Sequence, residues 1–305
     1  MSENPIDTKG AEINGFVVRK PPSRLVIAFR FFRHLLSVRL AGFALVVILV
    51  TVIMAAFAPF LAPHDPTFAG PDPLASPSMT NLLGTDQLGR DVLSQLIYGA
   101  RIALAVSTGA ILFGTVVGGL LGLVSGYFRG VLDAVVMRVV DALVAFPGLI
   151  LALALASALG PSVKTVIIAI GVANVPWIAR IARSEALTIR ESQYVLSAYA
   201  LGATAPRIIL RHVLPNALAP ILVQSTLGMG YAVLSAAALS FLGAGIPPPT
   251  PDWGSMVQFS FGLLNQDPLL SIVPGVAIFL LVLAFNLLGD AFRDVFDPRV
   301  RGSLS

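Results

Sequence analysis

Apolar and polar segments alternate along this chain, and the alternation predicts a series of membrane-spanning helices. A helix needs about 20 apolar residues to cross roughly 30 Å of hydrocarbon. Six segments approach or meet this length, with the third broken by a proline and the fourth short, and the one charged residue within them is Lys164 at the start of the fourth. They cover residues 40–62, 102–124, 142–159, 163–178, 217–242 and 269–288. The pattern therefore predicts an all-α membrane protein with six transmembrane helices.

Composition supports a membrane protein and narrows the possible chemistry. Hydrophobic residues make up 56% of the chain and charged residues only 12%, whereas soluble domains carry about 25% charged residues. There is no cysteine, which excludes disulfides and thiolate metal sites. The first apolar segment begins only at Leu40, later than the core of a secretory signal, so we expect no signal cleavage.

The distribution of basic residues predicts the orientation. Seventeen of the 20 Lys and Arg lie in the N-terminal tail, the C-terminal tail and the two polar segments on the same side of a six-span chain. The opposite side holds only Arg90, Arg101 and Lys164. Cytoplasmic segments are enriched in Lys and Arg, so both termini are expected in the cytoplasm. The net charge of +4 then reflects topology, and no nucleic-acid partner is predicted.

This topology divides the chain into five parts. We expect a cytoplasmic tail, a first span, an external loop, a core containing the other five spans and a second cytoplasmic tail, at 1–39, 40–62, 63–100, 101–291 and 292–305. A further external segment is expected at 244–268, and a cytoplasmic loop at 182–216.

Several local features predict packing rather than chemistry. Glycines repeat every fourth residue within the second span, at 114, 118, 122 and 126, which lets a second helix approach closely. Pro147 predicts a kink in the third span. Arg138 with Asp141, and Arg293 with Asp297, have the spacing of neighbours on one helical face, which predicts local or inter-subunit ion pairs at the membrane edge rather than a substrate site. In the external loop, a charged cluster is expected at the mouth of the pore, formed by Asp86, Arg90 and Asp91. Such a cluster could stabilise the structure and hold the partner permease, or it could receive substrate, and the structural role is favoured because both charge signs alternate over a few residues.

The loop at 182–216 contains two predicted short helices joined at a glycine. Tyr194, Val195, Ala198 and Leu201 recur with helical spacing. Gly202 then predicts a sharp turn, because glycine adopts left-handed backbone angles cheaply. For the second helix, Thr204 is expected to be the N-cap and Pro206 to occupy the first turn; Pro215 and Asn216 are expected to close it.

At these residues the chain resembles the permease subunits of ATP-binding cassette (ABC) importers. Their cytoplasmic loop has the pattern E-A-A-x3-G-x9-I-x-L-P and docks on the ATPase. Ala198, Gly202, Leu214 and Pro215 fall in register, whereas Leu196 and Ser197 replace the acidic residue and first alanine, and His212 replaces the isoleucine.

Further motifs carry the resemblance over most of the chain. They are L-G-T-D-Q-L-G-R-D at 83–91, G-Y-F-R-G-V-L-D at 126–133, M-R-V-V-D at 137–141, L-S-F-L-G-A-G at 239–245, W-G at 253–254, F-N-L-L-G-D at 285–290 and D-P-R at 297–299. Together they are similar to the second permease of dipeptide, oligopeptide, nickel or glutathione importers. The resemblance implies the type I importer permease fold, which is the fold of the methionine importer's permease.

The resemblance also implies partners and site residues. It implies a bacterial inner-membrane location, a heterodimer with a second permease, two cytoplasmic ATPase subunits, an external substrate-binding protein and surrounding lipid. Peptides are the first substrate expected, followed by nickel chelates, glutathione or opines. No cofactor is implied. Residues expected to couple the chain to the ATPase are Glu185, Tyr194, Leu196, Ser197, Ala198, Gly202, Arg207, Arg211, His212, Leu214 and Pro215.

The residues themselves argue against catalysis within the chain. No Gly-Lys pair exists, so the chain has no phosphate-binding loop of the kind found in ATPases. The predicted topology separates His34, His64 and His212, so no shared metal site is expected. Ion-coupled carriers, the main alternative, usually need ionisable residues inside the membrane, and the six predicted spans contain none apart from Lys164 at the external edge of the fourth, which is bare from Thr165 onward. ATP hydrolysis is therefore expected on separate subunits.

Overall fold

The computed structural model describes residues 12–13, 16–17 and 39–296, which are almost entirely helical. Two short strands, β1 (Glu12–Ile13) and β2 (Phe16–Val17), form an antiparallel pair. The helices in chain order are α2 (Arg39–Ala56), α3 (Ala58–Leu61), α4 (Val92–Phe128), α5 (Gly130–Val144), α6 (Gly148–Leu159), α7 (Val163–Arg190), α8 (Gln193–Ala200), α9 (Ala205–Ile208), the π-helix η1 (Ile209–Val213), α10 (Leu214–Phe241), α11 (Trp253–Ser260), the 3-10 helix η2 (Phe261–Leu263) and α12 (Leu269–Phe296).

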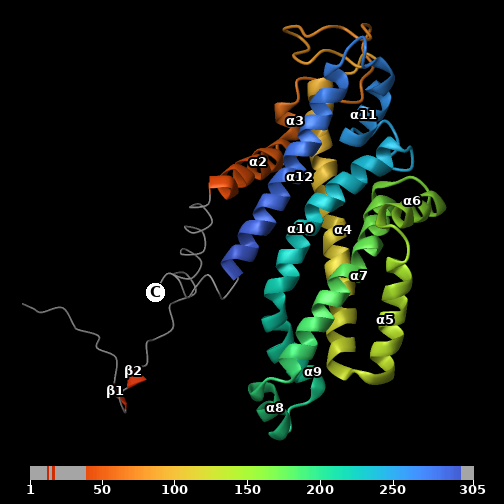
Figure 1. The fold of residues 1–305 in the computed structure, drawn as a ribbon. Coiled ribbons are helices and arrows are strands. Elements are labelled where there is room, and N and C mark those ends of the chain that lie inside the picture. Colours follow the sequence, from red (N-terminus) through yellow and green to blue (C-terminus); the bar gives the residue numbers. More distant parts are fainter. Residues whose placement is uncertain (1–11, 14–15, 18–38, 297–305) are drawn as a thin grey trace, which may run out of the picture.

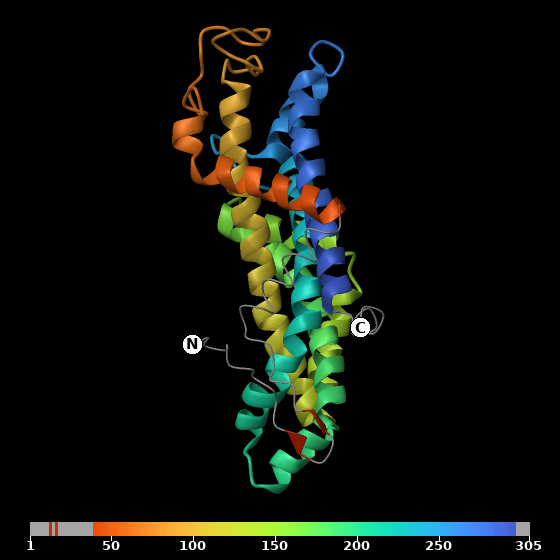
Figure 2. The same cartoon turned by 90° about the vertical axis from the view of Figure 1, so that its left-hand side faces the viewer.

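The long helices form an elongated bundle with distinct ends. α4, α7 and α10 run alongside one another, and α12 packs on α10 (Figure 1). The loop before α4 lies at one end with α11, whereas α8 and α9 lie at the other end (Figure 1). α2 runs across α4 and α12, as Figure 2 shows. The segments expected outside the cell thus gather at the end opposite the segment 193–208.

The glycine stripe of α4 is the contact surface for α7. A Cβ atom added at Gly118 would lie 2.6 Å from the carbonyl oxygen of Val175, and one at Gly122 would lie 2.2 Å from that of Ala179. Gly126 lies equally close to Arg183. A methyl group at these positions would overlap the neighbouring backbone, so glycine permits the close approach of the two helices. The packing predicted from the repeat is confirmed.

The six predicted spans are supported in part. Within the described residues, four helices are long and apolar enough to cross a membrane: α4, α7, α12 and the continuous helix from Ala205 to Phe241. The pair α5 and α6 would add a fifth span, although it bends by 90° between the two helices. α2 is apolar but shorter than these. The kink expected at Pro147 is therefore a full break, with Pro147 at the N-cap of α6.

Two helices extend beyond their predicted boundaries. α4 begins at Val92, inside the segment expected to be an external loop, because the Asp91 carboxylate accepts hydrogen bonds from the backbone N and the hydroxyl of Ser94 (2.8 and 2.7 Å) and caps the helix. α7 continues through the polar residues after Ile178 and ends at Arg190. The beginning of the expected 182–216 loop is therefore helical, and Glu185 lies on α7.

Ion pairs hold α5 against the polar half of α7. Arg183 donates two hydrogen bonds to Asp133, each 2.6 Å long, and Arg180 donates one to Asp141 at 2.8 Å. The expected local pair between Arg138 and Asp141 is wrong, because the fold places Asp141 beside α7. The pair expected between Arg293 and Asp297 lies outside the described residues. Since Val140 is the single buried residue of α5, these polar contacts do much of the docking of this helix.

Candidate ATPase-coupling site

The turn at Gly202 has the geometry of a glycine-terminated helix. Gly202 has a φ of +82°, in the left-handed region that favours glycine. Its backbone N–H donates to the carbonyl of Tyr199 (2.9 Å), and that of Ala203 donates to the carbonyl of Ala198 (3.0 Å). These two bonds form a Schellman motif, which satisfies carbonyls at the end of α8. The turn predicted from the sequence is confirmed.

The helix after this turn is longer than the sequence suggests. Thr204 occupies the N-cap but its side chain makes no capping hydrogen bond, and Pro206 lies in the first turn as expected. Pro215 and Asn216 do not close the helix, which continues from Ala205 to Phe241. The π-helical turn η1 precedes Pro215, and wider turns of this kind accommodate irregular residues within a helix. The Asn216 side chain also donates to the carbonyl of His212 at 2.6 Å.

Apolar contacts anchor this protruding segment to the bundle. Val195 of α8, Ile208 of α9 and Val213 of η1 are buried. They belong to one cluster with residues of α4, α7 and α10, among them Leu123 and Ile178. A buried side chain in a close-packed cluster moves only with its neighbours. Displacement of α8 would therefore be transmitted to the long helices.

Two arginine contacts tie the ends of α4 and α7 together beside the segment. Arg190 donates to the carbonyl of Tyr127 (2.7 Å), and its guanidinium group lies 5.7 Å from the centre of that tyrosine ring. Arg129, which follows α4, pairs with Glu191, which follows α7. The hydrogen bond from Arg129 holds the pKa of the Glu191 carboxyl group below its usual value. Nothing in the sequence spacing signals either contact, because the partners are about 60 residues apart.

The outer surface of the segment is apolar and exposed. Tyr199 and Leu201 are 71% and 89% exposed, and Tyr194, Leu196 and Leu210 are also exposed. Neither Tyr199 nor Leu210 is among the predicted site residues. Of the four residues with helical spacing, Val195 alone is buried in the cluster, whereas Tyr194 and Leu201 are exposed.

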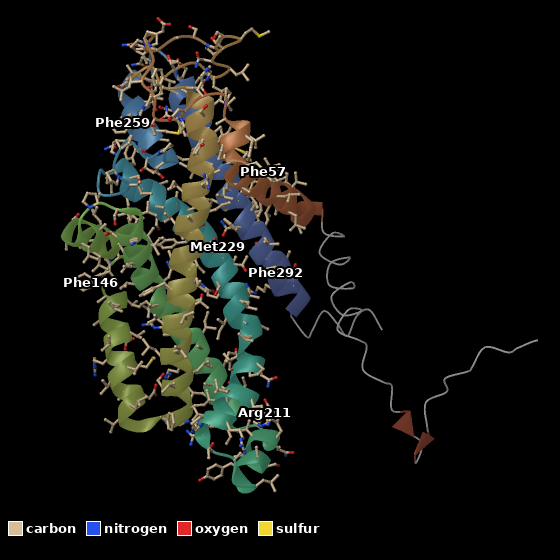
Figure 3. The ribbon with its side chains drawn as sticks, turned by 180° about the vertical axis from the view of Figure 1, so that it is seen from behind. Phe57, Phe146, Arg211, Met229, Phe259 and Phe292 are labelled. Carbon is tan, nitrogen blue, oxygen red and sulfur yellow. The ribbon has the colours of Figure 1, made fainter. Side chains whose placement is uncertain are left out.

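The remaining predicted residues divide between the surface and the anchor. Ser197, Arg207, Arg211 and Pro215 are exposed, whereas Glu185, Ala198, His212 and Leu214 are half-buried. Figure 3 places Arg211 in this protruding region, at the far end of the molecule from Phe259. The His212 ring lies 6.2 Å from that of Tyr194. Among the described residues, no three His, Asp or Glu side chains come together as a metal site.

A family model decides the classification of the chain. Residues 118–302 match the model for the binding-protein-dependent transport system inner membrane component, and residues 29–82 match that for the N-terminal TM domain of oligopeptide transport permease C. The chain belongs to this family of inner-membrane permeases. It is therefore a multi-pass protein of the inner membrane and the transport subunit of an ABC importer, with ATP hydrolysis on separate ATPase subunits.

Curated relatives match along nearly the whole chain. The dipeptide transport system permease protein DppC of Alkalihalophilus pseudofirmus is 41% identical over 88% of this chain and 89% of its own length. The glutathione transport system permease protein GsiD of Escherichia coli is 38% identical over 96% of this chain and 97% of its own.

Solved structures show that the fold is shared more widely. A permease chain from inward-facing conformations of the MetNI methionine ABC transporter matches with a TM-score of 0.55, at 22% identity over 67% of this chain and 97% of its own. A chain from an amino acid ABC transporter with histidines gives a TM-score of 0.51, at 18% identity over 66% of this chain and 93% of its own. At these identities the likeness concerns the fold alone.

Proposed function

We propose that this chain forms half of a translocation pathway for short peptides and couples it to ATP hydrolysis through residues 193–216. The other half is a second, similar permease. Two ATPase subunits bind on the cytoplasmic side, and a substrate-binding protein docks on the external side. The peptide assignment draws on the relatives named for dipeptide and glutathione transport, since glutathione is itself a small peptide.

The observation that carries the coupling role is an exposed apolar surface on a rigidly anchored segment. Exposed apolar patches on polar segments mark protein–protein contacts, and Tyr199, Leu201 and Leu210 form such a surface outside the bundle. Val195 and Ile208 anchor the same segment in the cluster shared by α4, α7 and α10. A partner that moves this surface therefore moves the helices that are expected to line the pathway.

The orientation follows from the same arrangement. Arg190 ends α7, Arg207 lies on α9 and Arg211 lies on η1, in agreement with the enrichment of cytoplasmic segments in basic residues. With this end in the cytoplasm, α11 and the loop before α4 face outward.

Reconstitution tests the function directly. The chain is assembled with its second permease, ATPases and binding protein in proteoliposomes, and uptake of a labelled dipeptide, glutathione or Ni²⁺ is measured with and without ATP. We expect ATP-dependent dipeptide uptake that requires the binding protein. Uptake driven by an ion gradient without the ATPase would instead establish the alternative, an ion-coupled carrier. ATP-dependent uptake of Ni²⁺ alone would overturn the peptide assignment.

A further inference from the structure

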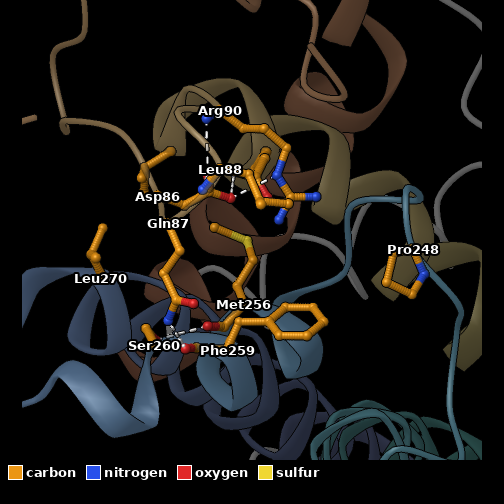
Figure 4. A pocket seen from close by; sticks show the side chains of 11 residues that line it. Asp86, Gln87, Leu88, Arg90, Pro248, Met256, Phe259, Ser260 and Leu270 are labelled. Carbon is orange, nitrogen blue, oxygen red and sulfur yellow. Dashed lines mark hydrogen bonds and ion pairs between the residues drawn. The ribbon is translucent and has the colours of Figure 1, made fainter. Parts of the chain in front are cut away.

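A cavity of about 250 Å³ lies at the predicted external end, between the loop before α4 and the segments α11 and α12. Figure 4 shows its lining, in which Leu88, Met256, Phe259 and Leu270 supply most of the apolar wall. Asp86 and Arg90 are the charged residues of the lining. The cavity is smaller than the sites of roughly 300–1,000 Å³ that hold drug-sized ligands, so it fits a group of about one residue.

Arg90 is a buried cation with part of its hydrogen-bonding capacity unused. Its Nε donates to Asp86 Oδ2 at 2.7 Å. Within residues 39–296, the structure gives the two terminal nitrogens of this guanidinium group no hydrogen-bond partner. Within the same residues no side-chain nitrogen is both fully buried and without a partner, so these nitrogens are accessible, and a charged donor on a mostly buried side chain is suited to receive an anion.

Asp86 holds this arginine in place. Its Oδ1 accepts from the backbone N–H groups of Leu88 and Arg90, both at 2.9 Å. Its Oδ2 accepts from Arg90 Nε and from Gln95 Nε2, the latter at 3.0 Å. With four donors the Asp86 carboxylate is well satisfied. It orients the Arg90 guanidinium group through Nε alone and leaves the two terminal nitrogens unused.

The other polar side chains of the lining are engaged elsewhere. Gln95 donates to Asp86 as above, Gln87 donates to the backbone carbonyl of Phe259 (Figure 4), and the Ser260 hydroxyl donates to the backbone carbonyl of Met256. The terminal nitrogens of Arg90 are therefore the charged donors left for a ligand. Two parallel N–H groups of a guanidinium match the two oxygens of a carboxylate.

We propose that this cavity binds a carboxylate carried by an apolar group, which is the chemistry of the C-terminal residue of a short peptide. Arg90 holds the carboxylate, and Leu88, Met256 and Leu270 surround the apolar group. The assignment to a peptide rests on the proposed function, whereas the carboxylate chemistry rests on the cavity alone. The permease would then contact one end of its substrate outside the membrane spans.

Ligand-observed NMR on the assembled complex in nanodiscs tests the proposal with three probes. We expect N-acetyl-leucine to bind and N-acetyl-leucinamide to bind at least tenfold more weakly, because the amide lacks the second acceptor oxygen and the charge. Inorganic phosphate should also bind more weakly, because it gains nothing from the apolar wall. Equal binding of the amide or of phosphate would overturn the proposal.

Variants locate the binding in the cavity. Leu88 is 58% exposed, so Leu88→Glu should fold normally while its charge repels a carboxylate and abolishes N-acetyl-leucine binding. The uncharged variant Leu88→Gln removes part of the apolar wall and should weaken binding by less than Leu88→Glu does. Arg90→Lys should weaken binding at least tenfold because lysine lacks the two-pronged donor. Arg101→Lys is the matched control, since Arg101 stacks on Tyr98 instead. Unchanged binding in Leu88→Glu would refute the assignment.

The source of the carboxylate and the transport function are tested separately. Ala-Leu should bind at least as well as N-acetyl-leucine; failure to do so would overturn the peptide source. The same complex is assayed for ATP-dependent dipeptide uptake. Uptake without binding of any carboxylate probe overturns the cavity proposal and leaves the transport function standing. Binding without uptake supports the cavity chemistry and contradicts the transport function.

Discussion

Replacement of Gly202 by valine tests whether the segment 193–216 couples ATP hydrolysis to transport. A Cβ atom at Gly202 would meet no other atom within 4 Å, so the substitution causes no clash within this chain. The cost comes from the φ of +82°, because left-handed angles cost a non-glycine residue roughly 1–2 kcal/mol. The observed turn should become about 5- to 30-fold less favoured relative to other conformations.

The expected result is loss of coupling with the membrane part intact. Expression and detergent stability of Gly202→Val should remain near those of the wild type, because Val195 and Ile208 still anchor the segment. Uptake and binding-protein-stimulated ATP hydrolysis, measured side by side in proteoliposomes, should fall together. Gly202→Asn should be milder, since asparagine tolerates this backbone conformation better.

Gly243 provides a matched control at the other end of the bundle. It has a φ of +80°, and the backbone N–H of Ala244 donates to the carbonyl of Leu239 in the same Schellman geometry. Gly243→Val therefore carries a similar backbone cost away from the proposed coupling surface, and it should retain more transport than Gly202→Val. Wild-type transport by Gly202→Val, or equal loss in both variants, would refute the reasoning.

Three further predictions follow from packing, charge and topology. Gly122→Ala should destabilise the protein by about 1–3 kcal/mol through overpacking against α7. The control Gly119→Ala, whose Cβ meets nothing within 4 Å, should be neutral or slightly stabilising. Thermal unfolding in detergent compares the two variants, and equal melting temperatures would contradict the close packing at Gly122. Burial raises the pKa of Asp252, which caps α11, so its contribution to stability is full below pH 3.8 and is lost as the pH rises through the raised pKa. Asp252→Asn should remove this pH dependence and keep the cap, whereas Asp252→Ala should lose about 1 kcal/mol of stability. Melting curves from pH 4 to 8 measure both effects, and an unchanged pH profile in Asp252→Asn would contradict the prediction. In this cysteine-free chain an impermeant maleimide should label Ser78→Cys in intact cells and leave Ser197→Cys unlabelled, and the reverse pattern would invert the proposed orientation.

Local features could be predicted from the sequence because their causes are local. The turn at Gly202 depends on one residue that tolerates a positive φ, followed by a proline that suits the first turn of a helix. The glycine stripe of α4 depends on the helical repeat of four residues, which puts small residues on one face. The apolar segments predict helices for the same reason, since their backbone groups have no partner in a membrane other than one another.

Features that depend on distant residues required the tertiary structure. Polar residues after Ile178 resemble a loop in the sequence, but they remain helical in α7, where Ala182 is buried against α4 and Arg183 pairs with Asp133 on α5, 50 residues away. Likewise, Arg90 appears in the sequence as one charge in a mixed cluster. Only the packing of the loop before α4 against α11 and α12 encloses it in a cavity.

The faces of α8 show the same division between sequence and structure. Helical spacing identified the helix but grouped Tyr194 and Leu201 with Val195, because the apolar character of a side chain does not reveal what covers it. The fold buries Val195 and leaves the other two exposed. The sequence by itself therefore determined that a helix ends at this glycine, and the tertiary structure decided which of its apolar residues are available to a partner, because burial depends on which helices pack against it.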